Sequence, residues 1–184
     1  MKLPWLDAAL ESFRRARASG RLPHAVLIQG SAGVGAQVLA QQLAQLCLCR
    51  GPSPQPCGQC LDCRQVAAHE HPDCHEVIPL EDSKQIRIEQ IRELASELAL
   101  TSHRPGYKIG LLWPADALNR NAANALLKTL EEPPPRTLLV LVAAVPSRLP
   151  ATLLSRCQRV RIAAPERAQS LAAQVHGDLE PDLT

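Results

Sequence analysis

Three cysteines at regular spacing are the residues of this sequence best suited to bind a metal. Cys57, Cys60 and Cys63 form a C-x2-C-x2-C pattern, and Cys49 lies eight residues before the first of them. Four thiolates on a short segment fit a closed tetrahedral zinc site, which stabilises a segment too small to build its own core. We therefore expect one structural Zn²⁺ ion, bound by Cys49, Cys57, Cys60 and Cys63.

Other interpretations of this cysteine cluster stay open at this point. Cys47 could replace Cys49 as the fourth ligand, an iron–sulfur cluster uses a similar triple spacing, and the three thiols could be a coincidence. The remaining cysteines, Cys74 and Cys157, lie in strand-like segments, so we expect them to be packing residues. Three nearby histidines are candidate ligands on proximity alone, but we expect them to be surface or capping residues: His69, His71 and His75.

A glycine-rich loop is the second feature that could do chemistry. Residues 24–29 are predicted as an apolar strand, residues 30–35 read GSAGVG, and an amphipathic run covers residues 38–44. A strand, a glycine loop and a helix in this order are the context of a phosphate-binding P-loop. That motif continues with a lysine and a serine or threonine, which neutralise the phosphates and hold Mg²⁺. This chain has alanine and glutamine instead, so we expect a loop that keeps its shape without binding ATP tightly. The altered loop comprises Gly30, Gly33, Gly35, Ala36 and Gln37.

The strand predicted over residues 108–113 lacks a further catalytic element. A P-loop ATPase ends the corresponding strand with acids that hold Mg²⁺ and orient the attacking water. Here Trp113 occupies that position, Pro114 and Ala115 follow, and the first acid, Asp116, comes too late for the role. Because two independent catalytic elements are missing together, we expect no intrinsic ATPase activity.

Apolar periodicity predicts helices that alternate with strands along the chain. Apolar residues make up 46% of the sequence and aromatic residues only 2%, so the core must consist of aliphatic side chains. Such a composition suits parallel strands that are covered by helices on both faces. We therefore predict an α/β, P-loop NTPase fold with a small zinc knuckle inserted. The predicted helices cover residues 6–17, 38–49, 88–100, 122–130 and 166–175, and the predicted strands cover 24–29, 74–79, 108–113, 138–144 and 158–162.

Length, charge and hydropathy argue against a strongly basic nucleic-acid-binding protein, a membrane protein and a secreted protein. The 184 residues suffice for one α/β domain with a small appendage, and a net charge of +2 creates no strong field for nucleic acid. No apolar run reaches the ~18 residues of a membrane span, and the first residues lack the apolar core of a signal peptide. We therefore expect a cytoplasmic protein, in which seven cysteines serve metal binding or packing rather than disulfides.

Two segments of the second half resemble the clamp-loader family of the AAA+ ATPases. They read AANALLKTLEEPP over residues 122–134 and LPATLLSRC over residues 149–157. The cysteine knuckle resembles the bacterial branch, and the altered loop resembles its non-hydrolysing subunits rather than the ATP-hydrolysing gamma/tau subunit. The resemblance extends from about residue 22 to 165. It implies an AAA+ domain over residues 1–164, with the zinc knuckle at 49–63, and the start of a truncated lid domain over residues 165–184.

The same resemblance implies roles for individual residues. Ser155-Arg156-Cys157 matches the family's Ser-Arg-Cys motif, in which the arginine acts in trans as a finger toward the γ-phosphate on a neighbouring subunit. A guanidinium suits this task because it is always charged and bidentate toward phosphate. The alternative is a surface arginine in an ordinary salt bridge.

Two further segments can be compared with the family pattern, and the first departs from it. Ala143 and Ala144 stand where active members carry a sensor threonine, so the resemblance implies that a third catalytic element is absent. Lys128, Glu131 and Glu132 match the end of a family helix. We expect Lys128 to pair with Glu131 or Glu132, and a subunit-contact role stays open.

The function implied is that of a non-catalytic clamp-loader subunit in DNA replication. Its partners would be the gamma/tau and delta subunits and, through the complex, the sliding clamp and primed DNA at the nucleoid-associated replisome. Two alternatives are an active P-loop ATPase with a divergent loop and a zinc-knuckle nucleic-acid-binding protein. The second would need clustered basic residues, which are absent around residues 57–63.

Overall fold

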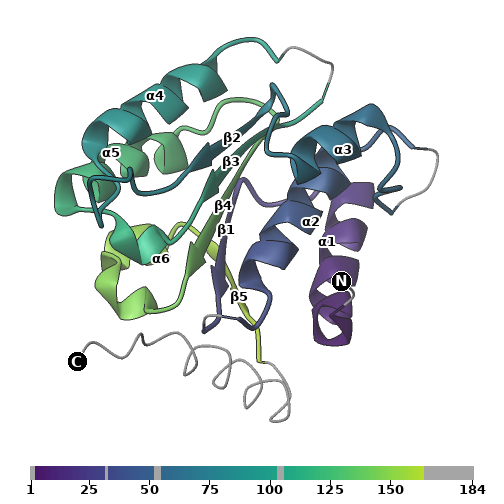
Figure 1. Cartoon of the computed structure of the whole chain (residues 1–184), viewed down its shortest axis with the longest axis horizontal. Coiled ribbons are helices and arrows are strands. Elements are labelled where there is room, and N and C mark those ends of the chain that lie inside the picture. Colours follow the sequence, from purple (N-terminus) through teal and green to yellow (C-terminus); the bar gives the residue numbers. More distant parts are fainter. Residues whose placement is uncertain (1–2, 32, 52–54, 103–105, 164–184) are drawn as a thin grey trace, which may run out of the picture.

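One parallel five-stranded sheet organises the molecule (Figure 1). The computed structural model describes residues 3–31, 33–51, 55–102 and 106–163. Every strand pair is parallel, and β1 lies between β4 and β5, with Val26 opposite both Val140 and Gln158. The strands, in their order across the sheet, are β2 (Cys74–Val77), β3 (Lys108–Leu112), β4 (Thr137–Ala143), β1 (Ala25–Gln29) and β5 (Gln158–Arg161).

Helices cover the two faces of this sheet in separate groups (Figure 1). The first group comprises α1 (Asp7–Ala18), α2 (Ala36–Leu48) and α3 (Leu61–Ala67). The second comprises α4 (Ile88–Ala99), α5 (Arg120–Glu131) and α6 (Ala151–Leu154). Short 3-10 turns at Pro4–Leu6, Ala115–Ala117 and Pro146–Arg148 complete the described elements.

The central strands divide their side chains between two apolar cores. Along β1, Val26 and Ile28 face the α1 and α2 side, whereas Ala25 and Leu27 face the α4 and α5 side. All residues of β3 and β4 are buried, because successive side chains point to opposite faces and helices cover both. The near-continuous apolar strands of the sequence follow from this double coverage.

The predicted α/β architecture is confirmed, with element bounds within a few residues of those expected. Two short helices were missed, α3 inside the cysteine segment and α6 before β5. The predicted helix at 166–175 and the proposed start of a lid domain at 165–184 lie outside the described residues.

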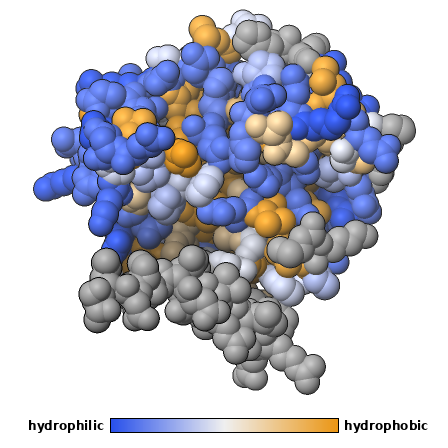
Figure 2. Space-filling view, viewed as in Figure 1, coloured by the Kyte–Doolittle hydropathy of each residue, from blue (hydrophilic) through white to orange (hydrophobic). Residues whose placement is uncertain are grey.

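The described surface offers no broad apolar face in the view of Figure 2, where apolar groups form separate patches among polar ones. None of the helices in the described ranges combines the length and the apolar character needed to cross a membrane. The large apolar side chains with substantial exposure are Leu61, Ile78, Leu80, Leu100 and Val145.

Candidate functional site

Two glycines at the described end of the glycine-rich loop have left-handed backbone angles at the start of a helix, as in a phosphate-binding loop. Gly33 and Gly35 have φ angles of 81° and 89°, which favour glycine, and Gly35 is the N-cap of α2. The Leu39 amide donates to the Gly35 carbonyl over 3.0 Å, and the Trp5 indole donates to the Val34 carbonyl over 2.9 Å. The loop is therefore held between the N-terminal segment and the start of α2.

A hollow of about 490 Å³ lies over this loop. Among the described residues that line it, none is charged. An anion in this hollow would meet backbone amides, apolar groups and the neutral polar side chains of Ser31 and Gln37, but no cationic side chain of the described lining. The lining comprises Leu3, Gly30, Ser31, Gly33, Gly35, Ala36, Gln37, Val38, Trp113, Pro114, Val142 and Ala144.

Trp113 lies directly after β3, where the hollow meets the edge of the sheet. Its indole N–H donates to a carboxylate oxygen of Glu76 on β2, and the other oxygen of Glu76 lies 2.6 Å from His69 Nδ1. Asp116 is occupied elsewhere, because its Oδ1 accepts from the Ala144 amide over 3.2 Å. Glu76 and Asp116 therefore both contact other groups of the protein in this structure.

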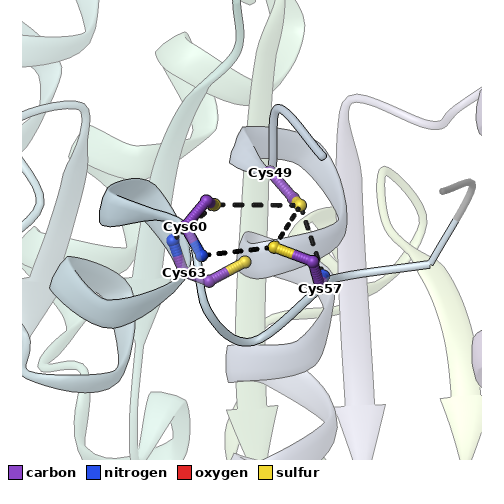
Figure 3. A group of neighbouring side chains, drawn as sticks. All are labelled: Cys49, Cys57, Cys60 and Cys63. Atoms are coloured by element: carbon purple, nitrogen blue, oxygen red, sulfur yellow. Dashed lines mark hydrogen bonds between the residues drawn. The ribbon is translucent and has the colours of Figure 1, made fainter. Parts of the chain in front are cut away.

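The four predicted metal ligands come together in one cluster (Figure 3). Their Sγ atoms all lie within 4.8 Å of one another, with 3.6 Å between Cys49 and Cys57 and 3.9 Å between Cys49 and Cys60. Zinc–sulfur bonds of about 2.3 Å in a tetrahedron place the sulfur atoms about 3.8 Å apart. The donor set and its spacing thus fit a closed Zn²⁺ site.

Backbone amides surround these sulfur atoms. The amides of Gly51 and Cys57 donate to Cys49 Sγ, each over 3.3 Å, and the Cys60 amide donates to Cys57 Sγ over 3.3 Å. Hydrogen bonds from the Cys60 and Gln59 backbones lower the pKa of Cys57 to about 6, whereas burial raises the pKa of Cys63. Amide donors of this kind stabilise the thiolate form that a metal requires.

The other cysteines lie outside the cluster. Cys47 is buried in the core beside α1, and this burial raises its pKa to about 12, so Cys49 is the fourth member of the cluster. Burial likewise raises the pKa of Cys74 to about 12 and that of Cys157 to about 11. The prediction that Cys74 and Cys157 are packing residues is confirmed.

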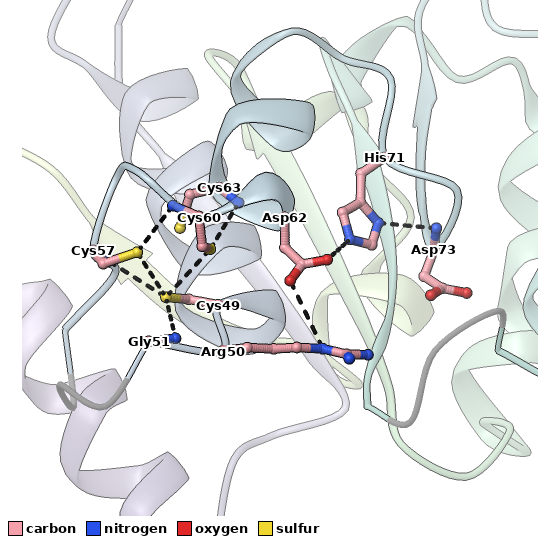
Figure 4. A network of polar contacts seen from close by, with 9 residues as sticks. All are labelled: Cys49, Arg50, Gly51, Cys57, Cys60, Asp62, Cys63, His71 and Asp73. Carbon is pink, nitrogen blue, oxygen red and sulfur yellow. Dashed lines mark hydrogen bonds and ion pairs between the residues drawn. The ribbon is translucent and has the colours of Figure 1, made fainter.

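A buried polar network joins the cysteine segment to the sheet (Figure 4). His71 Nδ1 accepts from the Asp73 amide over 3.0 Å, so Nε2 carries the proton of the neutral ring and donates to Asp62 Oδ1 over 3.3 Å. Arg50 Nε lies 3.7 Å from the second oxygen of Asp62. The side chains of Asp62 and His71 are only 5% and 1% exposed, so their mutual contact is shielded from water.

This network corrects the expectation that His71 is a surface or capping residue. The reason is α3, whose first turn contains Asp62 and directs its carboxylate toward the segment before β2. A signal was present in the sequence, since an acid in the first turn of a helix and the absence of Gly and Pro from residues 61–71 both favour a helix there.

Arg156 lies at the end of α6, near the end of α5. Its Nη2 is 2.6 Å from Glu131 Oε1, and its Nη1 donates to the Thr152 carbonyl over 2.8 Å. Lys128 was expected to pair with Glu131 or Glu132, and the ion pair that the structure gives Glu131 is with Arg156. A pairing of Lys128 with Glu132 stays a prediction.

The family comparison adds an independent finding. A family model described as "DNA polymerase III, delta subunit" matches residues 5–166. DNA polymerase III subunit delta' of Pseudomonas aeruginosa is 44% identical over 149 residues, which cover 80% of this chain and 45% of that protein. Subunit delta' of Escherichia coli K12 is 38% identical over 165 residues, which cover 88% of this chain and 49% of that protein.

The chain is also similar to other subunits of the same polymerase. DNA polymerase III subunit tau of Escherichia coli K12 is 35% identical over 146 residues, 79% of this chain and 22% of tau. A crystal structure of a gamma subunit-related protein from Thermotoga maritima has a TM-score of 0.64 at 24% identity, covering 88% of this chain and 48% of that one. The last similarity concerns the fold alone. The chain spans about half the length of the delta' relatives described above.

Proposed function

Because this chain belongs to the DNA polymerase III delta-subunit family, we propose that it serves as the non-catalytic delta-prime subunit of the clamp loader. It would act in a ring with the gamma/tau and delta subunits and help load the sliding clamp on primed DNA. This role places it in the cytoplasm, at the nucleoid-associated replisome. Residues 1–164 would form its AAA+ domain, and residues 165–184 would begin a lid domain.

The observation that carries the proposal is the uncharged hollow over a well-formed glycine loop. Ala36 and Gln37 stand where a lysine and a hydroxyl would handle phosphate and Mg²⁺, and Trp113 stands where an acid would. Loop amides and the dipole of α2 alone give only weak phosphate affinity. The loop is therefore a retained structural turn, and the alternative of an active ATPase has little support.

Arg156 supplies the chemistry that such a subunit would contribute. Only 35% of its side chain is exposed, and its two contacts leave further guanidinium N–H groups for an incoming phosphate. We propose that Arg156 acts in trans as an arginine finger toward ATP on a neighbouring gamma/tau subunit. The finger would stabilise negative charge that develops on the phosphoryl group during transfer.

For the cysteine cluster we propose a structural Zn²⁺ ion held by Cys49, Cys57, Cys60 and Cys63. Bound zinc would cross-link the segment between α2 and α3, which has few apolar side chains of its own. The nucleic-acid-binding alternative has little support, because Arg50 beside the cluster already faces Asp62.

Reconstitution of the clamp loader tests this function. The full gene product should co-purify with gamma/tau and delta, and zinc measured on the same sample should be about one ion per chain. In this complex, Arg156→Ala should lower DNA-stimulated ATP hydrolysis at least about tenfold, because an arginine finger contributes that much or more to phosphoryl transfer. Unchanged turnover in the assembled Arg156→Ala complex would contradict the finger role of Arg156. Failure of the parent protein to assemble with gamma/tau and delta would contradict the proposed subunit role.

A further inference from the structure

The partner of Arg156 belongs to a different element from Arg156 itself. Glu131 is the last residue of α5, and its Oε1 lies 2.6 Å from Nη2 of Arg156. The Thr152 carbonyl, in α6, accepts from Nη1 over 2.8 Å. The two terminal nitrogens of the guanidinium are therefore held from two sides.

The backbones that carry this pair are anchored in the core. Leu153 is fully buried and Cys157 is 9% exposed, so the turn that bears Arg156 is fixed on both sides. Leu130, directly before Glu131, is 2% exposed and belongs to the same apolar cluster. Because the backbone is already fixed at both residues, the ion pair between Arg156 and Glu131 restricts the rotamers of their side chains and not the path of the backbone.

The exposure of the pair indicates what it can do. The side chains of Arg156 and Glu131 are 35% and 51% exposed, and ion pairs at such sites contribute little to folding stability. A long arginine side chain nevertheless loses considerable rotamer entropy when it binds a ligand in one geometry. A contact that already selects one rotamer removes part of that cost before the ligand arrives.

We infer that Glu131 is a positioning residue for Arg156. It holds the guanidinium in one orientation at the end of α6, with donor groups left to meet the phosphate of a neighbouring subunit's nucleotide. This inference rests on the proposed finger role of Arg156. The contact with Glu131 does not prevent Arg156 from binding phosphate, because a nucleoside triphosphate offers the guanidinium more negative charge than one exposed carboxylate does.

Glu131→Gln tests the inference, and Glu132→Gln is its matched control on the neighbouring residue. In the complex with gamma/tau and delta, Glu131→Gln should lower kcat for DNA-stimulated ATP hydrolysis about fivefold and leave KM for ATP unchanged. The KM is set by the gamma/tau loop that binds ATP, whereas the finger acts in the transition state. Glu131→Asp, which keeps the charge, should recover part of the loss, and Glu132→Gln should stay within about twofold of the parent.

The double variant separates this inference from the proposed function. Glu131→Gln should have no effect when Arg156 is already alanine, because the two residues then act through one group. If Arg156→Ala lowers turnover but Glu131→Gln does not, the inference is wrong and the finger stands. If Glu131→Gln lowers turnover equally with and without Arg156, the residue acts by another route and the inference is again wrong. If Arg156→Ala has no effect, the proposed finger itself fails.

Discussion

At the scale of single residues, the glycine loop separates the shape of a phosphate site from its chemistry. Its glycines have the φ angles that the turn needs, and its amides precede a thirteen-residue helix. The two positions after Gly35 lack the charge and the hydroxyl that would use this geometry. Side chains at these two positions, rather than the fold of the loop, should therefore limit nucleotide affinity.

Ala36→Lys combined with Gln37→Thr should restore nucleotide binding. We expect the affinity for Mg²⁺-ATP to rise at least about tenfold, because an ammonium group and a hydroxyl would reach the phosphates and the metal. Titration with a fluorescent ATP analogue measures this change. Hydrolysis should stay absent, since Trp113 remains in place of the acid. Gln37→Thr alone is the control, and an equal gain from it would contradict the charge argument.

Gly35 should be intolerant of a side chain. It has a φ of 89°, and an added Cβ would lie 2.3 Å from Leu3 Cδ1, so Gly35→Ala combines backbone strain with displacement of the Leu3 side chain. We expect a loss of about 2–3 kcal/mol in the free energy of unfolding, measured in urea. Gly20→Ala is the matched control, because Gly20 has a φ of 67° with nothing within 4 Å. Its loss should be about 1 kcal/mol, and equal losses would show that Leu3 does not confine the loop.

At the scale of elements, the sequence predicted those helices and strands that are long enough to show a pattern of apolar residues. The strands around Leu27, Ile109 and Leu139 carry long apolar runs, so their place in a buried parallel sheet followed directly. The four-residue α6 is too short for periodicity to detect, and the seven-residue α3 is also short, although the acid in its first turn does favour a helix.

The cysteine site shows the same limit. The spacing of Cys57, Cys60 and Cys63, with Cys49 upstream, predicted all four members of the cluster, and the end of α2 explains why Cys49 rather than Cys47 joins it. The contact of Asp62 with His71 joins residues from two separate segments, and no local pattern specifies their orientation. The sequence thus predicted the ligand set better than its attachment to the sheet.

The attachment of α3 should depend on Asp62. Asp62→Ala removes the acceptor for the buried His71 ring and leaves one of its nitrogens without a protein partner. We expect a loss of about 1–3 kcal/mol in the free energy of unfolding, because an unsatisfied buried polar group costs about that much. Glu70→Ala, at an exposed acid three residues after α3, should change stability by less than about 0.5 kcal/mol. Chemical denaturation of zinc-loaded samples measures both, and equal effects would contradict the role of the network.

At the scale of the whole molecule, the cysteine segment and the sheet have different sources of stability. The sheet is covered on both faces by apolar side chains such as Leu27 and Val140, which are fully buried. The segment from residue 49 to 60 has no helix or strand among its described residues, and its sulfur cluster is its main internal contact. The two parts meet through α2 and the Asp62–His71 contact.

Removal of the proposed zinc ion should therefore loosen one part of the molecule and spare the other. After chelation, amide hydrogen exchange should become at least about tenfold faster in α3 and in residues 57–60, because the closed sulfur cluster no longer holds them. Exchange in β1 and β4 should change less than about twofold, since their hydrogen bonds lie between two intact cores. Cys60→Ser should reproduce this pattern without a chelator, and added Zn²⁺ should reverse it only in the parent chain. Equal acceleration in all strands would instead mean that the metal site stabilises the fold as one cooperative unit, and unchanged exchange in α3 would mean that the cluster holds no metal.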